Sequence, residues 1–126
     1  MIVLDSDVLI EILDRKSSKG DEALKQIIES GEKIATTAIN MHEVLYGLRK
    51  YSKPVKEILL IPTLNYTKED AVLASKIELE TEKTGKPASR TDTMIASITI
   101  NNGAKLYTFN SKHFNEIKNI GLTLFE

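Results

Sequence analysis

Three carboxylates and one amide in this sequence stand where a folded chain could bring them together. Asp5 and Asn110 each follow an apolar run typical of a buried strand. Glu43 and Asp92 each lie near the start of a segment with helical periodicity. Oxygen-only ligands with this charge suit a hard cation, Mg²⁺ or Mn²⁺, better than zinc or copper.

A cluster of carboxylates favours cation binding for a physical reason. Like charges a few ångströms apart raise each other's pKa, and a divalent cation removes that conflict. A bound Mg²⁺ makes a hydroxide from water near neutral pH, orients a phosphate and stabilises charge on the attacking and leaving oxygens. Phosphodiester hydrolysis is the chemistry that follows most directly.

Each of these residues also has a purely structural interpretation. Asp5 can cap the helix that follows it, and Glu43 stands three residues after Asn40, close to a capping-box spacing. Asp92 interacts well with a helix dipole, and Asn110 is at home in a turn. The structural interpretation does not predict that all four share one edge of a sheet.

Other polar residues near these positions are weaker candidates. Ser6 is interpreted as a hydrogen-bonding partner of Asp5 or of its metal-bound water, and His42 and His113 as surface or packing residues. Five basic residues flank Asp92 and Asn110 and could hold a phosphate backbone, although a solvated face explains most of them equally well: Lys83, Lys86, Arg90, Lys105 and Lys112.

Hydrophobic periodicity and turn residues place these positions on a simple framework. Strands are expected at residues 2–4, 33–37, 63–66, 105–109 and 121–125. Helices are expected at residues 8–13, 21–30 with Leu24, Ile27 and Ile28 on the inner face, 40–51, from Thr67 to Gly85, and 92–100, with a short one around 55–59 and a loop at 17–20.

Residues 92–100 are rich in β-branched side chains, but the helical spacing of Met94, Ile95 and Ile98 and the stop at 101–103 favour a helix.

With this choice, the predicted strands and helices mostly alternate along the chain. This order predicts one domain over residues 1–126, a three-layer α/β/α fold with a mostly parallel sheet of four to five strands. Ligands bind such sheets at the carboxyl ends of the strands.

Composition limits the class of protein further. The chain has 126 residues, 41% of them hydrophobic, and no Cys, so disulfides, thiolate zinc sites and a cysteine nucleophile are excluded. We expect a cytoplasmic protein with no membrane span. With 17 Lys+Arg against 18 Asp+Glu, an obligate nucleic-acid coat is disfavoured, but an enzyme that touches a phosphate backbone at one face is not.

Four segments carry a family resemblance in the right order and over nearly the whole chain. They resemble the four motifs of PIN-domain ribonucleases, specifically VapC-type toxins of toxin-antitoxin systems. The segments are Asp-Ser-Asp-Val-Leu-Ile at 5–10, Ala-Ile-Asn-Met-His-Glu-Val-Leu-Tyr-Gly at 38–47, Asp-Thr-Met-Ile-Ala-Ser at 92–97 and Leu-Tyr-Thr-Phe-Asn-Ser-Lys-His-Phe at 106–114.

The resemblance implies a Mg²⁺- or Mn²⁺-dependent endoribonuclease. Its metal ligands would be Asp5, Glu43 and Asp92, with Thr108 and Asn110 supporting the site. It also implies an RNA substrate such as tRNA or rRNA, a homodimer, and a cognate antitoxin that binds in or beside the active crevice.

The sequence departs from the pattern twice. Asn110 stands where many relatives carry Asp, and Asp7 where Asn or Ser is commoner. The first change lowers the charge of the site, and the second adds charge back.

Two other functions stay open. A haloacid-dehalogenase-like phosphatase would use Asp5 as its nucleophile, but Leu9 stands where that family has a small or β-branched hydroxyl residue, and its later Lys and acidic pair are missing. A receiver domain would need Asp where Thr67 stands. The third class is a non-catalytic RNA- or protein-binding module on the same fold, which the change at Asn110 keeps open.

Overall fold

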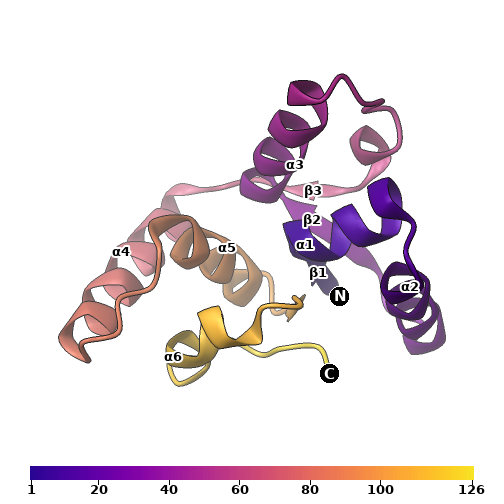
Figure 1. The fold of residues 1–126 in the computed structure, drawn as a ribbon. Helices are drawn as coiled ribbons and strands as arrows, with labels where there is room; N and C mark the ends of the chain where they lie inside the picture. Colours follow the sequence, from indigo (N-terminus) through magenta and orange to yellow (C-terminus); the bar gives the residue numbers. More distant parts are fainter.

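Four short parallel strands form the centre of the computed structural model, which describes residues 1–126 (Figure 1). Their order is β3-β2-β1-β4, so the chain builds the sheet outward on one side of β1 and then returns to add β4 on the other. This reversal places a topological switch point between β1 and β4. The strands are β1 (Ile2–Leu4), β2 (Ile34–Thr37), β3 (Thr63–Leu64) and β4 (Lys105–Tyr107).

The fifth predicted strand, at residues 121–125, is reduced to a single bridge. Leu106 of β4 donates its N–H to Thr123 (2.9 Å) and accepts from Phe125 (2.8 Å), and only Leu124 pairs with it. Gly121 has φ of +117°, a backbone conformation outside the range of a regular strand. The chain therefore meets the sheet edge at one point only.

Helices cover both faces of the sheet, as the three-layer prediction requires. The α-helices are α1 (Ser6–Leu9), α2 (Ser18–Ser30), α3 (Ala38–Lys50), α4 (Lys68–Lys83), α5 (Arg90–Asn101) and α6 (Asn115–Lys118). A π-helix, η1 (Ile10–Arg15), continues α1, and two 3₁₀ turns are η2 (Ile58–Leu60) and η3 (Ser111–Phe114). None of these helices has the length and apolar character needed to cross a membrane.

Alternation along β1 explains the two layers. Ile2 and Leu4 pack with α1, α2 and α3 in one buried cluster, whereas Val3 packs with α4, α5 and α6 in another. Figure 1 shows the two groups of helices on opposite sides of the strands. Because successive side chains of a strand point to opposite faces, one short buried strand supports both cores.

Helix α2 differs from the prediction in its first residues and in its buried face. Residues 17–20 are not a loop: Ser17 caps the helix by accepting a hydrogen bond from Gly20 N–H (3.0 Å). Gly20, together with Ala23 and Ile27, faces the core, whereas Leu24 and Ile28 are exposed. A Cβ at position 20 would collide with the Glu11 carbonyl, so only glycine allows this close approach between α2 and η1.

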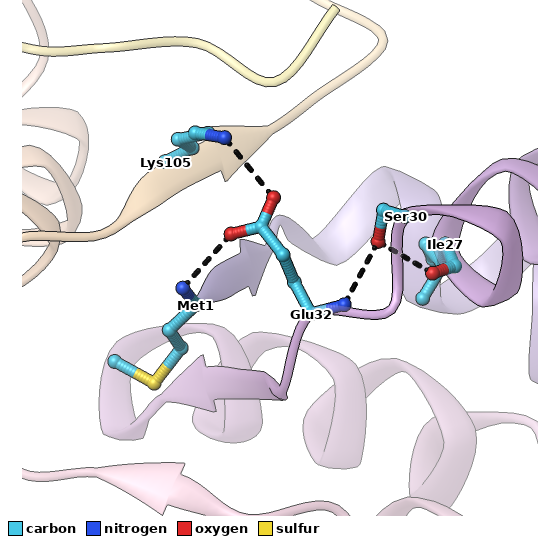
Figure 2. A network of polar contacts seen from close by, with 5 residues as sticks. All are labelled: Met1, Ile27, Ser30, Glu32 and Lys105. Atoms are coloured by element: carbon cyan, nitrogen blue, oxygen red, sulfur yellow. Dashed lines mark hydrogen bonds and ion pairs between the residues drawn. The ribbon is translucent and has the colours of Figure 1, made fainter.

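At the amino ends of the strands, one carboxylate joins three segments (Figure 2). Glu32 accepts from the Met1 amino group and from Lys105 Nζ, each at 3.0 Å. Its own N–H donates to the Ser30 hydroxyl (3.2 Å), which in turn donates to the Ile27 carbonyl (2.6 Å). The hydrogen bond from the amino terminus, followed by that from Lys105, lowers the pKa of Glu32.

Candidate active site

The predicted site residues gather at the opposite edge of the sheet, where the strands end. Asp5 directly follows β1 and Thr108 directly follows β4, so both lie at the switch point. Glu43 comes from α3 in one helical layer, and Asp92 comes from α5 in the other. Burial is the largest cause of the raised pKa of Glu43 and of Asp92, and the negative charge of Asp5 raises both further, so each lies within electrostatic reach of Asp5.

Asp5 is the centre of a hydrogen-bond network. Its Oδ1 accepts from Ser6 N–H (2.9 Å) and from Asn40 Nδ2 (2.8 Å), and its Oδ2 accepts from the Thr108 hydroxyl (2.8 Å). The predicted helix-capping role of Asp5 is therefore confirmed, because it is the N-cap of α1. The contacts to Asn40 and Thr108 go beyond capping and fix the carboxylate from β4 and α3 as well.

Asn40 contacts the predicted site residues in a way that the sequence did not indicate. It is fully buried, and its Oδ1 accepts from the Thr37 hydroxyl at 2.8 Å. Its amide nitrogen then has one hydrogen for Asp5 and one for the Ser6 oxygen (2.9 Å). The Ser6 hydroxyl donates in turn to Glu43 Oε1 at 3.0 Å. Thr37, Asn40 and Ser6 thus form one directed chain of three donors that ends on the carboxylates of Asp5 and Glu43.

The capping-box interpretation of Glu43 is wrong. Helix α3 starts at Ala38, two residues earlier than predicted, and the Thr37 hydroxyl caps it by accepting from Asn40 N–H (3.1 Å). Glu43 therefore lies in the second turn, beyond reach of the unpaired N–H groups. Partial removal from water raises the pKa of Glu43, and the charges of Asp5 and Asp92 add to this, whereas the Ser6 hydrogen bond opposes it.

Asp92 lies in the first turn of α5, where the prediction placed it. Ser89 caps the helix by accepting from the Asp92 N–H at 3.2 Å. Burial raises the pKa of the Asp92 carboxyl, and the charge of Asp5 raises it further, against opposing effects of Ser89 and His113. His113 lies near enough to act electrostatically, although no ion pair forms.

Asp7 connects α1 to the segment after β4. Its Oδ2 accepts from Phe109 N–H at 3.1 Å, whereas its Oδ1 is buried without a hydrogen-bond partner. Burial, and then the charge of Asp5, raises the pKa of Asp7. The sequence indicated only that Asp7 adds charge, and the structure shows that it also holds the backbone beside Thr108.

The fourth motif contributes to the network mainly through Thr108. The Thr108 hydroxyl donates to Asp5 and accepts from Asn110 N–H at 3.0 Å. Asn110 lies at the predicted edge, but its side chain is exposed and makes no hydrogen bond within the protein. A direct catalytic role for the Asn110 side chain stays a prediction.

Most of the basic residues that the sequence suggested for phosphate binding are already neutralised. Arg90 donates to Glu78 with both nitrogens (3.2 and 3.0 Å), and Lys105 lies at the amino edge, where it binds Glu32. Lys112 alone has no ion pair. Lys83 and Lys86 pair with Glu80 (3.4 Å) and Glu116 (3.8 Å).

The donors at this edge fit a hard cation. Asp5, Glu43 and Asp92 offer only oxygen atoms, and no Lys, Arg or His nitrogen lies within 4.0 Å of their carboxylates. No three His, Cys, Asp or Glu side chains form a closed coordinating group. Mg²⁺ keeps several of its waters in protein sites, so carboxylates that do not all reach one point can still share it, some of them through those waters.

A cleft runs from Glu43 along the surface between η1 and α3. The part that includes Glu43 has a volume of about 230 Å³ and is also lined by Gly47 and Tyr51. It shares residues with a more apolar hollow of about 400 Å³ toward η2: Ile10, Asp14, Val44 and Leu48. Tyr51, which lines the part with Glu43, is 68% exposed.

Comparisons with known proteins agree with the motif resemblance. The family model of the PIN domain matches residues 2–120. No curated protein sequence matches the chain. Among solved structures, the chain is similar to VapBC2 from Rickettsia felis bound to a promoter DNA fragment, with 22% identity, a TM-score of 0.79 and coverage of 99% of this chain and 98% of that one.

Two further structures extend this similarity. VapBC-1 from nontypeable Haemophilus influenzae has 21% identity and a TM-score of 0.79, with 100% of this chain and 98% of that chain covered. VapBC-5 from Mycobacterium tuberculosis, a member of a family of toxin-antitoxin systems, has 17% identity and a TM-score of 0.69, with 98% and 97% covered. At these identities the likeness establishes the fold.

Proposed function

Because the chain belongs to the PIN-domain family, we propose that it is a Mg²⁺- or Mn²⁺-dependent endoribonuclease and the toxin of a toxin-antitoxin pair. One observation carries this proposal: three carboxylates without basic partners meet at the switch point of the sheet. Partial burial raises the pKa of Glu43 and of Asp92 there, and the negative charge of Asp5 raises both further, so a shared cation would favour their charged forms. A phosphatase with Asp5 as nucleophile belongs to another family and is not proposed.

The residues of the chain have distinct parts in this reaction. Asp5, Glu43 and Asp92 would hold the cation, which would act as a Lewis acid and activate water when bound. Asn40 and Thr108 fix the Asp5 carboxylate. Hydrolysis of the bond between phosphorus and the 3′ oxygen, with water adding to phosphorus and the 3′ oxygen taking a proton, leaves a 5′-phosphate and a 3′-hydroxyl.

The orientation of Glu43 follows from the donor chain. Asn40 gives one amide hydrogen to Asp5 and the other to the Ser6 oxygen, so the Ser6 hydroxyl hydrogen is directed at Glu43 Oε1. Glu43 Oε2 stays free for a ligand. A carboxylate that is fixed before the substrate arrives loses little free energy to reorganisation in the transition state.

The cleft next to Glu43 supports an antitoxin partner. Solved structures similar to this chain are complexes named VapBC, described in one case as toxin-antitoxin systems. The apolar lining of the cleft and the exposed Tyr51 provide a surface that a protein segment could cover beside Glu43. We propose that the cognate antitoxin binds here, that the chain forms a homodimer, and that tRNA or rRNA is the substrate.

Cleavage of a 5′-labelled single-stranded RNA tests the activity. We expect cleavage with Mg²⁺ or Mn²⁺, none with EDTA, and 5′-phosphate on the downstream product. Asp5→Asn should abolish cleavage, whereas Asp21→Asn, the same change at an exposed acid on α2, should not. Equal cleavage by wild type and Asp5→Asn would contradict the proposal and indicate a contaminating nuclease.

Titration calorimetry with Mn²⁺ separates the enzyme from a non-catalytic module. We expect Mn²⁺ binding by the wild-type chain and a large loss in the Asp5→Asn and Asp92→Asn variants. A chain that binds RNA but no Mn²⁺ would be a binding module instead.

Co-expression tests the partner. If a small gene directly upstream encodes a DNA-binding protein, that protein and this chain should form a stable complex when they are produced together. Light scattering gives the oligomeric state.

A further inference from the structure

Lys19 is a cation that the fold fixes at the mouth of the candidate active site. It lies in the first turn of α2, is exposed, and places its Nζ 4.2 Å from the centroid of the Phe109 ring. Phe109 directly follows Thr108, and Asp7 holds its backbone N–H at 3.1 Å. The ring that receives Lys19 is thus tied to the same network that fixes Asp5.

The charge of Lys19 is not neutralised by an ion pair. No carboxylate oxygen lies within 4.0 Å of its Nζ. Two acids that feel its charge have other partners: Asp7 accepts from Phe109, and Glu11 accepts from Arg15 (3.0 Å) and Ser17 (2.6 Å). Burial and then Asp5 raise the pKa of Asp7, and the Ser17 hydrogen bond lowers that of Glu11, with Lys19 as a smaller lowering influence on each.

An RNA strand approaching this edge needs such a charge. The carboxylates of Asp5, Glu43 and Asp92 repel phosphates, and a bound cation offsets this repulsion only at the reacting phosphate. Arg90, and the other basic residues that pair with glutamates, would have to leave those partners first. To bind a phosphate, Lys19 would have to leave only its contact with the Phe109 ring, which is a weak interaction in water.

We propose that Lys19 is a positioning residue that contacts a backbone phosphate of single-stranded RNA beside the scissile phosphodiester, with the Phe109 ring holding it in place when no RNA is bound. This inference rests on the proposed ribonuclease function. An ammonium on a flexible stem suits a phosphate contact that needs charge but no fixed geometry. Because phosphates carry no sequence information, Lys19 should strengthen binding to all single-stranded RNAs alike.

Steady-state cleavage at several salt concentrations tests the proposal. We expect Lys19→Gln to raise KM several-fold with kcat nearly unchanged, and to reduce the slope of log KM against log salt by about 0.7, the value for one phosphate contact on a single strand. Lys19→Arg should keep KM and the salt slope near their wild-type values. The matched control is Lys25→Gln, which removes an exposed charge without an ion pair from the same helix and should change neither.

A binding measurement makes the outcome independent of turnover. In an Asp92→Asn background, fluorescence anisotropy with a labelled single-stranded RNA should show the same several-fold loss of affinity for Lys19→Gln and not for Lys25→Gln. If wild type cleaves RNA but Lys19→Gln and Lys25→Gln behave alike in KM, affinity and salt slope, the proposed Lys19 contact is wrong, whereas the proposed ribonuclease function is supported. If wild type neither cleaves nor binds RNA, both proposals are wrong.

Discussion

The two edges of the sheet use the same kind of side chain in opposite ways. At the amino edge, Glu32 meets two cationic groups, the Met1 amine and Lys105, and its pKa is lowered (Figure 2). At the carboxyl edge, Glu43 and Asp92 meet Asp5 and no basic partner, and their pKa values are raised. The amino edge has its charges paired within the chain, whereas a ligand with positive charge would stabilise the carboxyl edge.

Two properties separate these carboxylates. Removal from water is the largest cause of the raised pKa of Asp92, whereas hydrogen bonds from two cationic groups are the largest causes of the lowered pKa of Glu32. The fold also supplies ion pairs to Glu32 and none to Asp92. A carboxylate that the chain leaves uncompensated reduces the free energy of unfolding at neutral pH, so it is expected at a site where something else binds.

The largest expected effect comes from neutralising the carboxyl edge. Asp92→Asn should lower kcat for RNA cleavage by about 100-fold or more, because it removes a charge from the cation site. The same change should leave the thermal unfolding midpoint of the metal-free protein equal or higher, since it removes repulsion with Asp5. A large loss of both activity and stability would mean that Asp92 is structural.

A smaller loss of activity is expected from the donor chain. Ser6→Ala removes the hydroxyl that accepts from Asn40 and orients Glu43, and we expect cleavage to fall about 10-fold, as when an outer hydrogen-bond partner of a metal ligand is lost. Ser6→Thr keeps a hydroxyl and should recover most of the activity. If Ala and Thr at this position have equal rates, Ser6 does not orient Glu43.

Metal binding should stabilise only the carboxyl edge. At ten times its dissociation constant, Mn²⁺ should add about 1.4 kcal/mol to the free energy of unfolding, measured by urea denaturation with and without EDTA. Asp5→Asn should lose this gain, and Glu32→Gln should keep it. An equal gain in Asp5→Asn would place the stabilising ion elsewhere on the molecule.

The smallest effect is expected at the amino edge, where the groups are exposed to solvent. The lowered pKa of Glu32 means that its stabilising contribution is fully present above its unfolded value of 4.5 and is lost as pH falls through the folded value. Glu32→Gln should therefore lower the unfolding midpoint slightly at pH 7, and the two proteins should converge in acid. A difference between the two unfolding midpoints that persists well below pH 4.5 would contradict this assignment. RNA cleavage by Glu32→Gln should equal that of wild type.

Much of the fold could be predicted because local signals agreed with one another. Thr67 forms the predicted cap, and a capping box with Asp70 completes it. The choice of a helix for residues 92–100 is confirmed by α5, because the stop at 101–103 outweighed the preference of β-branched side chains for strands. The strand predicted at 121–125 was wrong in extent, because only tertiary contact determines how far a terminal segment pairs.

The role of the three carboxylates stays a prediction, but their placement could be anticipated from the order of strands and helices. Asp5 directly follows β1, and Glu43 and Asp92 lie near the starts of helices α3 and α5. The place of Asn40 could not be anticipated, because it depends on being buried between Thr37 and Asp5, a contact across 35 residues of sequence. In the sequence, the only signal is that an amide residue lies in the same motif as a carboxylate, and this signal is weak.

The position of β4 has a consequence for the time at which the site is completed. Residues 2–4 pair with residues 105–107, and the Thr108 hydroxyl reaches Asp5 across 103 residues of sequence. A chain that is still being translated lacks β4 until more than a hundred residues have been made, so until then Asp5 has the Asn40 contact but not the Thr108 contact. Synthesis from the amino terminus thus delays assembly of the complete hydrogen-bond network around Asp5 until β4 has joined the sheet.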